Sequence, residues 1–292
     1  MYEQKSLDTI KKFWPKDAPD IKIVPKYINK YARELIVIKY GGNVLIDRNI
    51  FNNFIEDISV LNKLGLSIVV IHGGGPRIKR ELDKSNIQSK FIRGLRVTDE
   101  KIINIVENVL IDFNIDIVDS LKEKGTEAIS INTKKNNIIE VIPESEELGF
   151  VGKPSKINSD IIKNILAKNM IPIISPLGVG KNNQTYNING DTAAGAIAKS
   201  LKSRRLILMT NINGVLDKEK KLIEEITSSE ILKMINDEII TEGMIPKINT
   251  CLDAVNNGVT GVVIVDGRKP HSILFEIFSD KGAGTLIRKW MN

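Results

Sequence analysis

Apolar runs of strand length alternate with segments whose apolar residues recur at helical spacing along most of the chain. Residues 35–38 and 67–71 are such strand-length runs, and a helical pattern between them covers 50–64 and ends at Gly65. A second helical pattern covers 100–124, and the remaining strand candidates are 171–174, 206–209 and 262–265. Strands that alternate with helices predict an α/β fold, a three-layer α/β/α sandwich whose mostly parallel central sheet is covered on both faces.

Two stretches depart from this alternation. Residues 1–30 contain three prolines and few apolar runs, so we expect an extension that precedes the fold, with a short helix over 7–14 that Pro15 ends. Residues 132–158 place short apolar runs on either side of charged turns, which predicts a hairpin-like excursion from the sheet.

The composition is that of an ordinary globular protein and argues against several classes. Of the 292 residues, 42% are apolar and 27% are charged. No apolar run approaches the ~18 residues of a membrane helix, and no secretory signal is evident, so we expect a cytoplasmic protein. The net charge of +6 comes from lysines scattered among acidic residues, with only 5% aromatics, which favours a solvated cationic surface over a nucleic-acid interface.

The histidines and the cysteine suggest no metal site and no disulfide. His72 and His271 are too few and too far apart in the sequence for a zinc site. We interpret His72 as a strand-end histidine whose hydrogen bonds are satisfied. Cys251 is the only cysteine, which excludes an internal disulfide, and its place in a helical pattern predicts a small core residue.

Two of the predicted strands end in glycine-rich turns. Gly41 and Gly42 follow the first strand, and residues 73–75 follow the second. Glycine lets the backbone approach a ligand closely, the next helix offers free N–H groups, and turns after parallel strands lie where ligands bind. Neither G-x-x-x-x-G-K-[ST] nor G-x-G-x-x-G occurs, so an enzyme that handles phosphate here must use another architecture.

Two lysines and an aspartate are candidates for a site near these turns. Lys39 ends an otherwise apolar strand directly before the glycines; the alternative is an edge lysine that reaches solvent. Lys247 follows Pro246 at the start of a helix, where a cation is unfavourable unless an anion compensates it. Asp191 opens a helix of small residues, where it either caps the first turn or orients lysines or a metal.

With these residues in place, the chain resembles the amino acid kinase family from about residue 25 to 288. The residues 94–99 are similar to the members that phosphorylate N-acetyl-L-glutamate, rather than to their aspartate, carbamate and uridylate relatives. Seven stretches carry the resemblance, in the family's order: Ile38–Asn43, His72–Pro76, Gly94–Asp99, Gly149–Gly152, Asn187–Asp191, Gly214–Asp217 and Gly243–Lys247.

The resemblance implies transfer of the γ-phosphoryl of ATP, with Mg²⁺ bound largely through the phosphates, to the side-chain carboxylate of N-acetyl-L-glutamate, the second step of arginine biosynthesis. It implies an amino-acid lobe over 31–200 and a nucleotide lobe over 201–292. Lys39, Lys247 and Asp191 would be catalytic. Substrate would bind at Gly74, Gly75, Arg96, Asn187 and Asn189, and ATP at Gly41, Gly42, Thr210, Asn211 and Gly214.

The sequence departs from the family pattern in two places. Asn211 stands where aspartate is usual, and the segment after Leu110 is shorter than in the family, with Asn114 as its retained residue. One alternative is a kinase for a related acylated amino acid of the aminoadipate type. Another is a non-catalytic sensor with the same fold, against which the presence of all three catalytic residues argues.

The C-terminal segment 267–285 and residues 24–31 resemble the arginine-inhibited branch of the family. The resemblance implies an L-arginine site at His271, Glu276 and Gly282, and a homo-oligomer, either a dimer or a hexamer joined by N-terminal helices. The local pattern also fits an amphipathic helix with an exposed Glu276. Prolines at positions 15 and 19 interrupt the segment where a joining helix would run.

Overall fold

The computed structural model describes residues 6–31, 34–42, 47–131, 133–240 and 244–289. Asn43 and Gly243, which belong to the sequence motifs, lie outside these ranges. Within the described residues, no helix is both long enough and apolar enough to cross a membrane.

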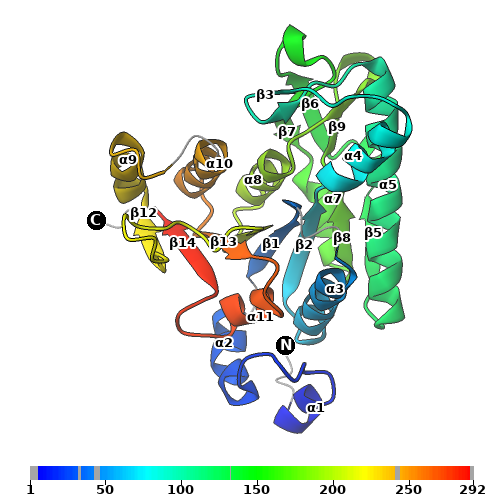
Figure 1. The fold of residues 1–292 in the computed structure, drawn as a ribbon. Coiled ribbons are helices and arrows are strands. Elements are labelled where there is room, and N and C mark those ends of the chain that lie inside the picture. Colours follow the sequence, from blue (N-terminus) through cyan, green and yellow to red (C-terminus); the bar gives the residue numbers. More distant parts are fainter. Residues whose placement is uncertain (1–5, 32–33, 43–46, 132, 241–243, 290–292) are drawn as a thin grey trace.

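An eight-stranded sheet forms the centre of the molecule (Figure 1). Its strand order is β12-β14-β13-β11-β1-β2-β8-β5, and the pairs from β13 to β5 are all parallel. Only the pairing of β14 with β13 is antiparallel. The bounds are β1 Leu35–Tyr40, β2 Ser67–His72, β5 Ala128–Ile131, β8 Ile171–Ile174, β11 Arg205–Thr210, β12 Glu225–Thr227, β13 Val262–Asp266 and β14 Gly284–Arg288. The predicted α/β fold with a mostly parallel sheet is confirmed.

Helices cover both faces of this sheet, because successive strand residues point to opposite sides. Ile36 and Ile38 of β1 belong to a core with α3, α5 and α11, whereas Val37 belongs to a core with α7, α8 and α10. The bounds are α3 Arg48–Lys63, α4 Gly75–Lys84, α5 Glu100–Glu123, α7 Ser159–Leu166, α8 Gly190–Ser200, α9 Ser228–Asn236, α10 Ile245–Asn256 and α11 Ser272–Ile277. Cys251 is buried in the second core, as predicted.

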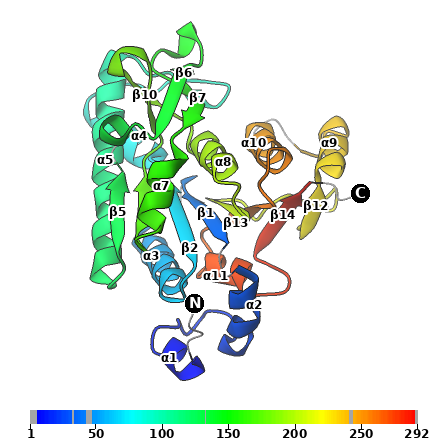
Figure 2. The same ribbon diagram turned by 180° about the vertical axis from the view of Figure 1, so that it is seen from behind.

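The excursion predicted over 132–158 is confirmed. Strands β6 Ile139–Pro143 and β7 Gly152–Ile157 form an antiparallel pair within a smaller sheet of order β10-β9-β6-β7. This sheet lies beyond the carboxyl ends of β1 and β2, next to α4 and α5 (Figure 2). Its other strands are β9 Leu177–Val179 and β10 Thr185–Asn187, and the ribbon β3 Phe91–Ile92 with β4 Leu95–Arg96 lies nearby. Short helices α6 Thr133–Asn136, η3 Glu146–Leu148 and η4 Lys181–Asn183 connect these strands.

The described part of the N-terminal extension packs against the body of the protein. It forms α1 Leu7–Lys11, η1 Ile21–Ile23 and α2 Val24–Tyr31, so α1 ends before Pro15, as expected. Ile10 and Ile28 are buried in the same core as α3 and α11, and the Trp14 ring contacts that of Phe278 at a centroid distance of 5.5 Å. The extension therefore contributes to the hydrophobic core.

Candidate active site

Three charged side chains from distant parts of the chain meet above the central sheet. Lys39 is the penultimate residue of β1, Asp191 lies in the first turn of α8, and Lys247 lies in the first turn of α10. Lys39 Nζ is 2.9 Å from Asp191 Oδ1, and Lys247 Nζ donates a hydrogen bond to Asp191 Oδ2. The exposed fractions of the three side chains are 9%, 14% and 16%, so this group is largely shielded from water.

The electrostatics of this group depend on its burial. Burial alone would raise the pKa of Asp191, but the ammonium groups of Lys39 and Lys247 outweigh it and hold that pKa far below its usual range. For Lys39, burial lowers the pKa, Asp191 partly restores it, and Lys247 lowers it further. The carboxylate thus keeps two cations side by side, each available to an incoming anion.

Glycines beside Lys39 leave room for its side chain. A Cβ atom on Gly41 would lie 2.1 Å from Lys39 Nζ, and one on Gly190 would lie 3.2 Å from Lys39 Cε. A larger residue at Gly41 would therefore displace the ammonium group. This requirement explains why a glycine directly follows Tyr40, and why the helix that carries Asp191 begins with a glycine.

The N-cap of α8 is Asn189, which corrects one interpretation of Asp191. Asn189 Oδ1 accepts hydrogen bonds from the backbone N–H groups of Asp191 and Thr192, at 2.9 and 3.1 Å. Asp191 therefore does not cap the first turn, and its carboxylate is oriented toward the two lysines.

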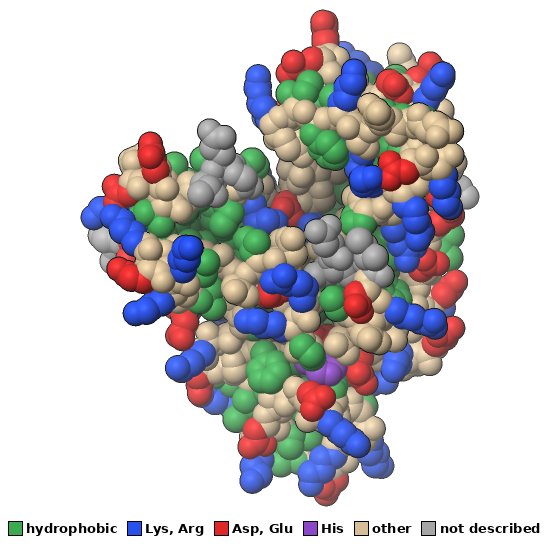
Figure 3. Space-filling model, viewed as in Figure 1, with side chains coloured by type: hydrophobic (Ala, Val, Ile, Leu, Met, Phe, Trp, Pro, Cys, Tyr) green, Lys and Arg blue, Asp and Glu red, His purple; other side chains and the backbone are tan. Residues whose placement is uncertain are grey.

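A pocket of about 1190 Å³ opens directly beside the lysines. Figure 3 shows the molecule hollowed between the part that carries α9 and α10 and the part that carries α4 and β3. Both glycine turns reach this pocket, through Gly42 on one side and residues 73–75 on the other. Of the residues predicted to bind ligands or act in catalysis, it brings together Lys39, Gly42, Gly74, Gly75, Arg96, Asn187 and Asn189.

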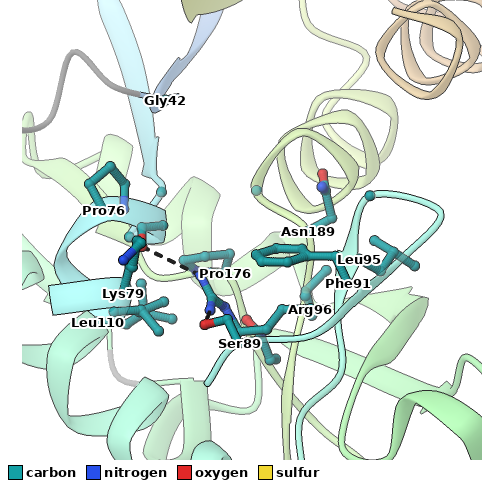
Figure 4. Close-up of a pocket in the computed structure, with 18 of the residues that line it drawn as sticks. Gly42, Pro76, Lys79, Ser89, Phe91, Leu95, Arg96, Leu110, Pro176 and Asn189 are labelled. Carbon is teal, nitrogen blue, oxygen red and sulfur yellow. Dashed lines mark hydrogen bonds between the residues drawn. The ribbon is translucent and has the colours of Figure 1, made fainter. Parts of the chain in front are cut away.

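Arg96 is one of the cations that line this pocket, together with Lys79, Arg80 and Lys84, and Figure 4 shows it near Ser89 and Phe91. Its guanidinium donates to the Ser89 hydroxyl and, at 3.5 Å, to the Gly75 carbonyl, and it lies 4.7 Å from the Phe91 ring centroid. Burial lowers the pKa of Arg96, but a guanidinium stays protonated in proteins. Held by these contacts, Arg96 can bind a carboxylate with two parallel hydrogen bonds. Nothing in the local sequence around Ser89 or Phe91 indicated this role.

The residues predicted to bind nucleotide lie on the other side of the lysines. Thr210 ends β11, next to β1, and a Cβ atom on Gly42 would lie 4.0 Å from its Cα. Thr210 Oγ1 is 3.4 Å from Asn211 Oδ1. Gly214 has φ +137°, and a Cβ atom there would lie 2.5 Å from Thr285 Oγ1. The close packing against Thr285 alone accounts for this glycine.

The altered segment after Leu110 does not interrupt the fold. Residues 111–116 lie within the continuous helix α5, and Leu110 still lines the pocket. Asn114 is 1% exposed, and its amide donates to the Ile173 carbonyl at 2.9 Å. Asn114 therefore faces the sheet and does not line the pocket.

The residues predicted to bind the effector lie in two separate places. Glu276 and Gly282 lie together: Glu276 Oε2 accepts from the N–H of Ala283 at 2.9 Å, and a Cβ atom on Gly282 would lie 2.6 Å from that oxygen. Glu276 is only 9% exposed, so the alternative of an exposed Glu276 is wrong. His271 instead pairs with Asp57 of α3, with Nδ1 2.6 Å from Oδ1.

Comparison with known proteins decides the family. The model of the amino acid kinase family matches residues 34–266. The chain belongs to the amino acid kinase family. The resemblance predicted from the seven motifs is therefore confirmed, and the kinase fold accounts for the two glycine turns at the carboxyl ends of β1 and β2.

Curated relatives share most of the chain. It is 54% identical over 275 residues to the acetylglutamate kinase of Pelagibacter ubique, covering 94% of this chain and 96% of that protein. It is 46% identical to the acetylglutamate kinase of Clostridioides difficile, covering 90% and 94% of the two chains. The corresponding enzyme of Methylobacterium nodulans is 45% identical, with 90% and 91% covered.

Solved structures show the same fold. The N-acetylglutamate synthase of Neisseria gonorrhoeae, complexed with coenzyme A and N-acetyl-glutamate, matches with a TM-score of 0.84 at 22% identity. The match covers 99% of this chain but only 65% of the synthase. The smu.665 protein of Streptococcus mutans matches with a TM-score of 0.74 at 31% identity, covering 87% of this chain and 98% of that one.

Proposed function

We propose that this kinase transfers the γ-phosphoryl group of ATP to the side-chain carboxylate of N-acetyl-L-glutamate, giving N-acetyl-L-glutamyl 5-phosphate and ADP. The observation that carries the proposal is the ion-paired group of Lys39, Asp191 and Lys247 beside a pocket that contains Arg96. The relatives named acetylglutamate kinase support this acceptor.

The chemistry required is mainly the control of negative charge. A carboxylate oxygen of the acceptor attacks the γ-phosphorus while the bond from that phosphorus to the β–γ bridging oxygen breaks and ADP leaves. Two anions must therefore approach each other, and the transferring group carries charge throughout. Lys39 and Lys247 approach from different elements and would stabilise that charge, while Asp191 holds both ammonium groups in place.

The residues that line the pocket suggest how the substrate would lie in it. Arg96 would bind the α-carboxylate of the substrate, and Asn187 would bind its other end, as the resemblance implies. Gly74 and Gly75 line the same pocket, and their N–H groups would contribute to substrate binding. Binding the acceptor at both ends would direct its side-chain carboxylate toward Lys39.

Nucleotide would occupy the region of Gly41, Gly42 and Thr210, with Mg²⁺ arriving on its phosphates. Among the described residues, no three His, Cys, Asp or Glu side chains gather in a way that could hold a metal ion. Asp191, the acidic residue nearest the reaction, already pairs with two lysines. Mg²⁺ ligated mainly by phosphate oxygens and water fits this arrangement, and it would neutralise part of the phosphate charge.

A hydroxamate assay tests the reaction. Hydroxylamine traps the acyl phosphate, so purified protein with ATP, Mg²⁺ and N-acetyl-L-glutamate should form a hydroxamate. The kcat/KM for N-acetyl-L-glutamate should exceed that for the homologous N-acetyl-L-2-aminoadipate. A preference for the aminoadipate derivative would replace the proposed substrate, and ATP binding without any hydroxamate would favour the sensor alternative.

A second proposal is inhibition by L-arginine at the cavity around Glu276. This cavity of about 140 Å³ is lined by Glu276, by cations that include Lys30, Arg205 and Arg288, and by the acidic residues Glu224, Glu225 and Asp280. A guanidinium could pair with Glu276 while the α-carboxylate of the same ligand meets the cations, and burial would strengthen both contacts. L-arginine titrated into the assay should lower the rate, and Glu276→Ala should weaken that response. Unchanged activity at millimolar arginine would refute this regulatory role.

The assembly of the chain is also a proposal. We infer a homo-oligomer, a dimer or a hexamer, from the resemblance of residues 24–31 to the arginine-inhibited branch. Light scattering on the full chain and on a form lacking residues 1–24 measures the mass directly. Because Ile10 and Val24 are core residues, the truncated form needs a thermal melt beside it as a control for folding.

A further inference from the structure

His72 lies directly beneath the second glycine turn and has no role in the reaction described above. It ends β2, is 0% exposed, and its ring contacts that of Phe113 edge-on at a centroid distance of 5.1 Å. An imidazole buried this fully is costly unless both ring nitrogens have partners. Those partners therefore show what the side chain does.

The partners determine which ring nitrogen carries the proton. His72 Nδ1 is 2.9 Å from the Gly73 carbonyl oxygen, which can only accept, so Nδ1 must carry a hydrogen and donate. His72 Nε2 then accepts, from the Asn114 amide at 3.2 Å, with the Ser175 hydroxyl also 3.2 Å away. Burial lowers the pKa of His72 to about 4, so the ring is neutral near pH 7.

The bond to Gly73 also orients the next N–H group. The peptide between Gly73 and Gly74 is trans, so its C=O and N–H point in opposite directions. With the Gly73 carbonyl held by His72, the N–H of Gly74 must point away from the imidazole. Gly74 lines the pocket, and among the described residues no backbone or side-chain acceptor meets its N–H. This donor is therefore available to a ligand.

We propose that His72 is a positioning residue, whose Nδ1–H holds the Gly73 carbonyl so that the N–H of Gly74 points at the group transferred between nucleotide and acceptor. This inference rests on the proposed kinase reaction. Asn114 and Ser175 complete the arrangement, because they bind Nε2 and keep the ring in the tautomer that donates from Nδ1. Asn114, the residue retained in the segment after Leu110, would therefore influence the second glycine turn through His72 and not by touching a ligand.

Two amide variants separate this role from a merely structural one. The side-chain amide of His72→Asn can donate from nearly the position of Nδ1, whereas that of His72→Gln reaches the position of Nε2 and cannot hold the Gly73 carbonyl. Losing one oxyanion donor costs ~10²–10³ in kcat, so we expect about a tenfold or larger fall in kcat for His72→Gln with little change in either KM. His72→Asn should retain most of the wild-type kcat.

The kcat values of the two variants decide whether the proposal holds. A low kcat in His72→Gln that His72→Asn restores supports the proposal, provided that circular dichroism and thermal melts show both variants folded. Equal kcat values in the two variants, or effects confined to KM, overturn it.

A spectroscopic measurement tests the proposal without any substrate. The chain has only two histidines, so the nitrogen-15 NMR spectrum of the imidazoles is simple, and a His271→Gln variant assigns it. At pH 7 we expect His72 as the neutral tautomer with a protonated Nδ1. An Nε2–H tautomer or an imidazolium overturns the proposal. A negative kinase assay with this expected spectrum would instead count against the proposed reaction.

Discussion

Replacing Asp191 with asparagine removes the charge that holds the two lysines together and nearly preserves the shape of the side chain. Removing one partner of a buried ion pair typically costs about 3–5 kcal/mol, because the other charge is left uncompensated. Here two ammonium groups would remain, each in a side chain less than a fifth exposed. Since Asp191 raises the pKa of Lys39, while burial and Lys247 lower it, the variant should also lose the Lys39 ammonium at a lower pH.

The hydroxamate assay and thermal denaturation measure these effects. We expect Asp191→Asn to lower kcat by ~10²-fold or more, since the lysines lose their orientation, and to shift the alkaline limb of the pH profile toward lower pH. The melting temperature should fall without ligand and partly recover with ATP, whose phosphates replace the missing negative charge.

Asp253→Asn is the matched control for this variant. Asp253 belongs to α10, the helix that carries Lys247, and pairs with Lys199 of α8, but the side chains are 53% and 30% exposed. A surface ion pair contributes about 0–1 kcal/mol, so kcat should stay unchanged and the melting temperature should change little. If Asp191→Asn behaved like Asp253→Asn, the assignment of Asp191 as the organiser of the two lysines would be refuted.

Three further predictions concern single residues. Gly41→Ala should lower kcat by ~10²-fold or more, because its Cβ would lie 2.1 Å from Lys39 Nζ; a normal kcat would show that Lys39 can act from another position. Arg96→Ala should raise the KM for the amino acid by ~10-fold or more with a smaller effect on kcat, and equal losses in both would contradict its role in ground-state binding. The hydrogen bond to Asp57 raises the pKa of His271 above 6.5, and burial raises the pKa of Asp57 to about 6. The stability that the His271 proton contributes is therefore present below pH 6.5 and is lost as pH rises through the folded-state pKa of His271. Thermal melts should therefore show wild type losing its advantage over His271→Gln as pH rises above 6.5, and a pH-independent difference would contradict this.

Local sequence patterns were sufficient for five strands of the central sheet, for helices such as α3 and α5, and for the positions of the glycine turns, whereas β5, β12 and β14 were not predicted. Apolar runs such as residues 35–38 and the helical pattern over 100–124 depend on side-chain periodicity, which is a local property. The position of Gly41 and Gly42 at a strand end likewise follows from their neighbours. A parallel sheet then brings such turns to one edge, which made the ligand-binding edge predictable without coordinates.

Side-chain partners across the fold required the tertiary structure. Asp191 and Lys247 are 56 residues apart, and the sequence left the capping interpretation of Asp191 open until Asn189 was seen to bind the helix N-terminus. The burial of Glu276 was likewise undecided, because an amphipathic pattern does not show what packs against the helix.

His72 is another residue whose side-chain partners could not be predicted from the sequence. Its position at a strand end was visible in the sequence, and the expectation of satisfied hydrogen bonds was correct. Asn114 and Ser175, however, lie 42 and 103 residues away, and only the packing of α5 against β8 brings them to its ring. Periodicity determines which side of an element a residue occupies, whereas hydrogen bonds and ion pairs depend on distances of a few ångströms between elements, which only the packed chain sets.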